Sequence, residues 1–110
     1  MYEGYFKNNK AHGKGRKIWD KNDGTETYYI GDFENNLKHG KGHYHWREGT
    51  FYDGEFRNDK REGRGRMKWK RTNELYIGQW MYDKRHGHGM MTYRDQSTYV
   101  GKWENDKRHG

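Results

Sequence analysis

The stretch YIGDFENNLKHGKGHYHW, residues 29–46, decides the fold because it alternates. Aromatics and glycines occupy every second position in two runs, first Tyr29, Gly31 and Phe33, then Gly40, Gly42, Tyr44 and Trp46. Successive side chains of a β-strand point to opposite faces, so a period of two is typical of strands. The stretch therefore predicts two strands joined by a polar turn, with aromatics and glycines on one face.

The same pattern occurs five times along the chain. Each unit opens with Tyr-x-Gly-x-aromatic, and the opening residues are Tyr2, Tyr29, Tyr52, Tyr76 and Tyr99. The first four units continue with Gly-x-Gly and a further aromatic, whereas the fifth reaches only Gly110. The spacing varies only between that last aromatic and the next tyrosine. This variation marks a loop, because insertions collect in loops.

Each unit is predicted to be a β-hairpin. In four units the link between the strands carries residues that tolerate the left-handed backbone of tight turns, namely Asn8-Asn9, Asn35-Asn36, Asn58-Asp59 and Asn105-Asp106. The fourth unit has Tyr82-Asp83 there, a weaker match. We expect one all-β domain over residues 1–110: an extended, single-layer antiparallel ribbon of stacked hairpins. At about 4.8 Å per strand, it would be roughly 45 Å long.

The glycines need an explanation of their own, because glycine is a poor strand residue. Their fixed register with the aromatics indicates that rings of neighbouring strands lie flat over bare backbone. Hairpins that share aromatics in this way stabilise one another, although a single hairpin is marginal. The alternative, that the glycines serve only turns, stays open at this point.

The composition alone would suggest a disordered chain. Only 28% of the residues are hydrophobic, 35% are charged and the net charge is +7. The 17% of aromatic residues and their periodic placement argue against disorder. The chain has no cysteine, which excludes disulfides and cysteine-based zinc sites. It has no apolar run of the length of a signal peptide or membrane span, so a cytoplasmic location is expected.

Catalytic and metal-binding patterns are weak. The chain has one serine, Ser97, and no cysteine, so no nucleophile–base pair can be assembled. His43-x-His45 could supply two zinc ligands, but no third ligand is evident on that face. Four other histidines share one repeat position before a glycine: His12, His39, His86 and His109. We therefore expect no enzyme activity, no cofactor and no metal site.

Basic residues also recur with the repeat. Five follow the turn and two lie between paired glycines, giving the set Lys10, Lys38, Arg61, Arg85, Arg108, Lys41 and Arg64. Stacked units would align them as a stripe along one edge. Such a stripe could meet anionic lipid headgroups or an acidic protein, or could only protect the edge from strand addition. Nucleic acid is not expected as a partner, because packing already uses the aromatics.

The segments YDGEFRNDKREGRGRMKW (residues 52–69) and YVGKWENDKRHG (residues 99–110) resemble the MORN repeat, the membrane occupation and recognition nexus. The resemblance extends from Tyr2 to Gly110. Departures are Lys17, where later units carry Tyr or Met, and the long loop after Trp19. Such repeats occur in junctional membrane proteins, phosphatidylinositol phosphate kinases, cytoskeletal scaffolds and ciliary radial-spoke heads. The resemblance implies a scaffold role, with any catalysis residing in another domain.

We therefore expect a non-catalytic scaffold of a cytoskeletal or ciliary axonemal assembly. Its partner would be a protein that places a helix or an extended peptide in a groove of aromatics and glycines. The residues predicted to line this groove are Tyr29, Phe33, Trp46, Tyr52, Phe56, Trp69, Tyr76 and Trp80. The alternative is a membrane tether that binds anionic phospholipids through the basic stripe. Self-association through the end of the array is a further expectation.

Overall fold

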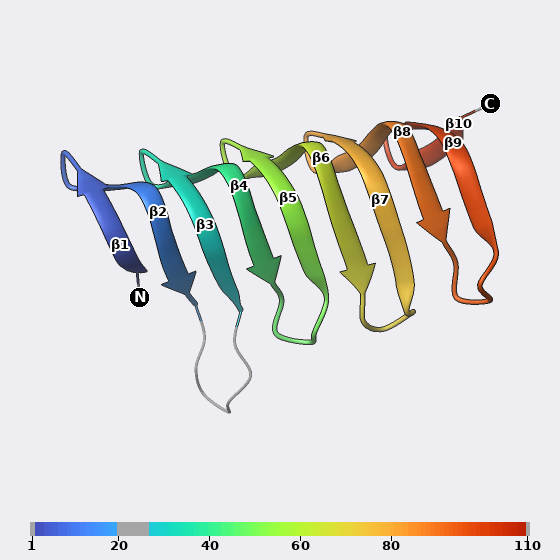
Figure 1. The fold of residues 1–110 in the computed structure, drawn as a ribbon, viewed down its shortest axis with the longest axis horizontal. Helices are drawn as coiled ribbons and strands as arrows, with labels where there is room; N and C mark the ends of the chain where they lie inside the picture. Colours follow the sequence, from blue (N-terminus) through green and yellow to red (C-terminus); the bar gives the residue numbers. More distant parts are fainter. Residues whose placement is uncertain (1, 20–26, 110) are drawn as a thin grey trace.

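The computed structural model describes residues 2–19 and 27–109, which form one sheet of ten β-strands (Figure 1). Neighbouring strands follow one another in the sequence, and every pair is antiparallel. The strands are β1 (Tyr2–Lys7), β2 (Lys10–Ile18), β3 (Tyr28–Glu34), β4 (Leu37–His45), β5 (Phe51–Arg57), β6 (Lys60–Trp69), β7 (Glu74–Met81), β8 (Lys84–Thr92), β9 (Thr98–Glu104) and β10 (Lys107–His109).

The prediction of an all-β, single-layer ribbon of stacked hairpins is confirmed. The longest extent of the molecule is 46 Å, close to the expected length. Residues 2–19 and 27–109 contain no helix of the length and hydrophobicity needed to cross a membrane. Residues 20–26 of the loop after Trp19 lie outside the described residues, as does Gly110.

Two-residue turns close all five hairpins at one edge of the sheet. Both residues of every turn have positive φ, between 49° and 71°. Positive φ at both central positions is the requirement of a type I′ turn, whose twist matches that of the flanking strands. Tyr82-Asp83, the weaker match in sequence, adopts the same conformation with φ of 49° and 67°. The ladder on both sides of the turn thus overrides the preference of tyrosine.

A row of glycines crosses the sheet perpendicular to the strands. The strand register aligns them one to one, from Gly4 through Gly15, Gly31, Gly42, Gly54, Gly65, Gly78 and Gly89 to Gly101. Tyrosine rings lie over this glycine row. A Cβ atom added to Gly65 would overlap the hydroxyl end of Tyr52. The prediction that rings lie over bare backbone is confirmed for the second glycine of each Gly-x-Gly.

The first glycine of each Gly-x-Gly has another role, and the expectation that both support rings is wrong. Gly40, for example, has φ of 105° and belongs to a bulge. Gly31 pairs with Gly42 and Phe33 with Lys38, so Asp32 alone faces residues 39–41. The Asp32 carboxylate accepts a hydrogen bond of 3.1 Å from the freed Lys41 amide. Glu55 and Gln79 do the same for the amides of Arg64 and His88.

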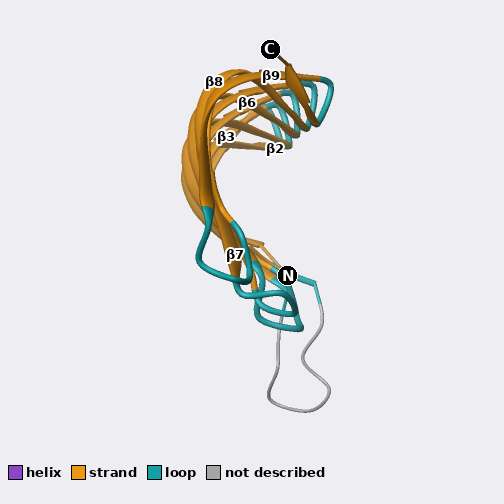
Figure 2. Ribbon diagram, turned by 90° about the vertical axis from the view of Figure 1, so that its right-hand side faces the viewer, coloured by secondary structure: helices purple, strands orange, loops and turns teal. Residues whose placement is uncertain are grey.

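Bulges and glycines together bend every unit. Two residues four apart on a flat strand are about 13 Å from each other. The rings of Tyr29 and Phe33 nevertheless meet edge to face, with centroids 5.1 Å apart. The strand must therefore bend toward the ring side at Gly31. Figure 2, viewed along the array, shows the resulting trough. The aromatic rings line its concave face, and the opposite face is convex.

The trough is filled by its own side chains. Tyr29, Tyr52 and Tyr76 have no exposed surface. The Tyr52 ring contacts Phe56 of its own unit at 5.0 Å and Trp80 of the next unit at 5.4 Å, both edge to face. Its hydroxyl donates a hydrogen bond of 2.8 Å to the Glu55 carbonyl. The same contacts recur around Tyr29 and Tyr76. A single-layer sheet thus obtains a hydrophobic core.

Candidate binding trough

Each unit is joined to the next by a clasp at the tight turn. In the third junction, the Arg61 amide donates a 2.7 Å hydrogen bond to the Asp83 carboxylate, and the Asp83 amide donates back to the Arg61 carbonyl at 3.1 Å. The Arg61 guanidinium adds bonds to the carboxylate and the carbonyl of Asp83. The two backbone-anchored bonds recur in the pairs Ala11/Asn36, Lys38/Asp59 and Arg85/Asp106.

The cations of three clasps, and Arg108 at the corresponding position of the last unit, lie over aromatic rings in the trough. The Arg61 guanidinium carbon is 4.7 Å from the centre of the Trp80 ring, and that of Arg85 is 4.5 Å from Trp103. The Lys38 ammonium lies 5.2 Å from Tyr44, and Arg108 lies 5.2 Å from Tyr99. Each contact of this kind contributes about 0.5–1 kcal/mol at exposed sites. These four cations therefore cover the core, as well as carrying charge.

The sheet divides the residues of the predicted basic stripe between its two faces. Lys41 and Arg64 precede glycines of the glycine row, so their side chains point to the convex face. Lys38, Arg61, Arg85 and Arg108 lie on the concave face. Lys10 is one position out of register: Ala11, which is buried, occupies the place of Lys38 in the first unit.

The predicted groove residues separate in the same way. Six of the eight have at most 6% of their surface exposed: Tyr29, Phe33, Tyr52, Phe56, Tyr76 and Trp80. They form the floor of the trough, so a partner could reach only their margins. The other two, Trp46 and Trp69, are half-buried and pack against that floor. Only these two of the predicted residues offer substantial ring surface to a partner.

Trp46 and Trp69 line the same pocket in the trough, with a volume of about 460 Å³. Met67 and Trp80 are its buried apolar residues. Charges of both signs complete the lining: Arg61, Arg85, Glu48, Asp83 and Asp106. The sequence suggested the aspartates only as turn formers. An aspartate recurs two residues before Arg61, Arg85 and Arg108, and this repeated Asp-x-Arg spacing could have indicated the bonds between units.

The chemistry of the trough is that of a binding surface. Burial raises the pKa of Tyr76 to about 12 and that of Tyr29 and Tyr52 well above the ordinary value. These hydroxyls therefore stay protonated at neutral pH. Among the described residues, no three His, Asp or Glu side chains gather in a way that could hold a metal ion. The trough offers ring faces, guanidinium groups and carboxylates.

A family model for the MORN repeat matches residues 2–24, 29–51, 52–71, 76–98 and 99–110. The chain belongs to the MORN repeat family. Each match begins at one of the five opening tyrosines, so the MORN units coincide with the predicted hairpin units. No curated protein matches the chain. MORN repeats are generally non-catalytic scaffold modules that bind proteins or membranes.

Proposed function

We propose that this MORN array is a scaffold that binds a segment of a partner protein in the concave trough. The supporting observation is the pocket between Trp46 and Trp69. Elsewhere in the trough the predicted groove rings are buried, whereas these two tryptophans from consecutive units keep ring surface at one opening. Tryptophan and arginine are enriched among the residues that dominate binding energies at protein interfaces.

The polar groups of the pocket suit a peptide ligand. Arg61 and Arg85 are already held by Asp83 and Asp106, so little conformational freedom would be lost on binding. Arginine donors and carboxylate acceptors could bind polar groups of the partner, while an apolar anchor fills the space between the tryptophans. A helix or an extended peptide could supply such an anchor. We further propose a cytoplasmic, cytoskeletal or ciliary assembly as the setting, by analogy with the family.

Site-specific photo-crosslinking tests this proposal. A benzoylphenylalanine at Trp69, inside the trough, is expected to crosslink a partner protein in cells. The same residue at Lys14, on the convex face, is the matched control and should give no such adduct. Adducts that form equally from both positions, or only from Lys14, would refute a trough-binding scaffold.

The membrane alternative predicts another result. Vesicles containing phosphatidylinositol bisphosphate would float the chain at physiological salt, and Lys41→Glu with Arg64→Glu would abolish flotation. That outcome, together with no adduct from Trp69, would replace the protein-binding scaffold by a membrane tether. Flotation at low salt alone is expected under our proposal, because the net charge of +7 attracts anionic surfaces and physiological salt screens this attraction.

A further inference from the structure

Aliphatic side chains form a row on the convex face of the last units. Ile77 pairs with Met90, and Met90 with Val100, on three adjacent strands. Their exposed fractions are 42%, 36% and 74%. The concave core does not need these side chains, because they point away from it. A chain that is only 28% hydrophobic thus leaves three neighbouring aliphatic residues in solvent.

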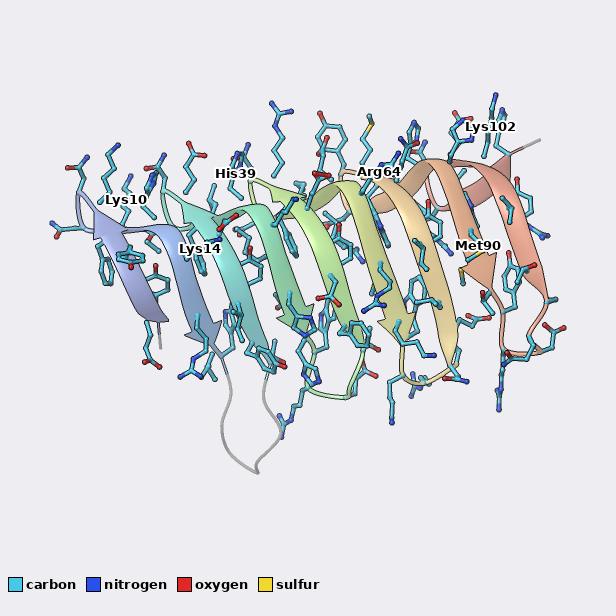
Figure 3. The ribbon with its side chains drawn as sticks, viewed as in Figure 1. Lys10, Lys14, His39, Arg64, Met90 and Lys102 are labelled. Atoms are coloured by element: carbon cyan, nitrogen blue, oxygen red, sulfur yellow. The ribbon has the colours of Figure 1, made fainter. Side chains whose placement is uncertain are left out.

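This row is one wall of a groove with a volume of about 680 Å³. The floor is the backbone of four glycines of the glycine row, Gly65, Gly78, Gly89 and Gly101. Arg64, Gln79 and His88 form the other wall. The bend of the sheet explains the groove, because bending toward the concave face spreads the side chains on the convex face. Figure 3 shows Arg64 and Lys102 nearer the tight turns than Met90.

Over the earlier units, side chains of the same convex row contact one another. There it continues with His43, Asp53 and Arg66, and both His43 and Arg66 contact the Asp53 carboxylate. The rings of His43 and Phe51 stack at 5.6 Å. Planar and paired groups thus cover the backbone in the second and third units. Asp53 and Arg66 also line the groove at this end, and the aliphatic row beyond them lacks such a cover.

The charges around the groove favour an acidic occupant. Within the described residues, the side chains of Arg64 and Lys102 form no ion pair. Glu55, the nearby carboxylate on the neighbouring strand, is turned into the bulge to accept the Arg64 amide. The one carboxylate that lines the groove, Asp53, is paired with Arg66. A second copy of this chain would bring the same cations face to face.

We propose that the groove over Ile77, Met90 and Val100 docks an amphipathic helix with an acidic flank, supplied by a partner protein. A helix repeats its apolar anchors about every 5.4 Å and the strands are about 4.8 Å apart, so each helical turn rests on one strand. Four strands span about 19 Å, the length of about 13 helical residues. The site goes beyond the trough function, since it lies on the opposite face.

Selection of peptides tests the groove directly. A library of 14-residue helical peptides carries leucine on one stripe and randomised glutamate, lysine or serine beside it, and is panned on the whole chain. We expect enrichment of glutamate on one flank. Ile77→Asp with Val100→Asp should weaken the enriched peptides at least tenfold. Val100→Asp alone, at the most exposed position, should weaken them measurably without affecting the fold.

Matched variants decide between the surfaces. Ile30→Asp, in the same convex row outside the groove, should leave affinity unchanged, as should Trp69→Gln in the trough. Arg64→Glu with Lys102→Glu should shift the selection toward lysine. The proposal is overturned if no peptide binds the wild type better than Ile77→Asp/Val100→Asp, if lysine is enriched on the wild type, or if Trp69→Gln abolishes binding. Loss of binding to phosphatidylserine vesicles in Ile77→Asp/Val100→Asp, without peptide selection, would assign the groove to a membrane.

Discussion

The two sides of the glycine row bury their rings to different extents. On the side of the tight turns, Phe33, Phe56, Trp80 and Trp103 keep only 4–6% of their surface exposed. On the side of the longer loops, the corresponding rings of Trp46, Trp69 and Tyr93 are half-buried and Trp19 is 44% exposed. The tight turns all have the same backbone form, whereas the loops between units vary in length.

This difference in burial separates the part of the sheet that stabilises the fold from the part that is open to a partner. On the tight-turn side, ring, turn and clasp depend on one another, so the second to fifth units repeat the same ring contacts, whereas Phe6 of the first unit is 64% exposed. On the long-loop side the rings are only partly covered, and the pocket in the trough opens between two of them. We infer that the tight-turn side holds the fold and the long-loop side carries recognition.

The largest expected effect is a difference in stability between alanine variants of Trp80 and Trp69, which lie on adjacent units. Trp80→Ala should lower the free energy of unfolding by about 3–5 kcal/mol, because a fully packed ring and its hydrogen bond to the Gly65 carbonyl are lost. Trp69→Ala should cost about 1–2 kcal/mol, since its ring is only partly buried against the core. Urea denaturation of both variants measures the difference. Equal costs would refute the division between the two sides.

The glycine row gives the next effect. Gly65→Ala should destabilise the chain by about 3 kcal/mol, because its Cβ atom would displace the Tyr52 hydroxyl from a closed core. Gly101→Ala gives the comparison in the last unit, where the added Cβ atom would meet the hydroxyl of Tyr99, a ring that is less buried than Tyr52. It should cost about 1 kcal/mol. The order of the two denaturation midpoints tests whether packing by the next unit holds the tyrosine in place.

In the clasp between the third and fourth units, Asp83 should contribute more to stability than Arg61. Asp83→Ala leaves the part-buried Arg61 amide without its acceptor, which costs about 1–3 kcal/mol. Arg61→Ala reproduces the residue that the first junction has at Ala11, and should cost about 1 kcal/mol or less. Thermal melting of the two variants compares them. A larger loss for Arg61→Ala would mean that the cation holds the junction.

Alkaline pH should destabilise the chain by ionising tyrosines whose pKa is raised by burial, Tyr76 among them. Burial raises the pKa of Tyr76 to about 12, so its stabilising effect is complete below pH 10 and is lost as the pH rises through 12. Between these values, Tyr76 should lower the free energy of unfolding by about 1.4 kcal/mol per pH unit. Urea denaturation from pH 8 to 12 measures the slope. In Tyr76→Phe the dependence of the free energy of unfolding on pH should weaken by about 1.4 kcal/mol per pH unit. An unchanged dependence would contradict the ionisation of Tyr76 as its cause.

The alternation of residues in the sequence was enough to predict the strands, the tight turns and aromatic rings lying over glycines of neighbouring strands. It failed where the bulge interrupts the alternation. Counting by two places Gly40 and Gly42 in the same role, but only Gly42 lies under a ring. It also aligned Lys38 with Lys41, which lie on opposite faces. The bulge depends on a contact between Asp32 and the Lys41 amide on the paired strand, and alternation along one strand carries no trace of it.

The groove residues could be predicted as aromatic but not as accessible. A flat sheet would have left Phe33 and Phe56 open to solvent. The bend brings each of them against two tyrosines, and this burial requires the neighbouring unit. Trp46 and Trp69 stay accessible because they lie beyond the bend, next to the loops. The sequence alone has no signal for this distinction, since all of these positions recur in register.

The most direct test of the account is the affinity of Trp46→Gln/Trp69→Gln for the partner segment identified by crosslinking, measured beside its melting temperature. We predict that the variant still unfolds cooperatively, with a melting temperature about 10 °C below the wild type, and that its affinity is at least tenfold lower. Unchanged affinity in the folded variant would contradict recognition by the long-loop side. Unfolding of the variant would contradict the division itself, because the two tryptophans would then hold the fold.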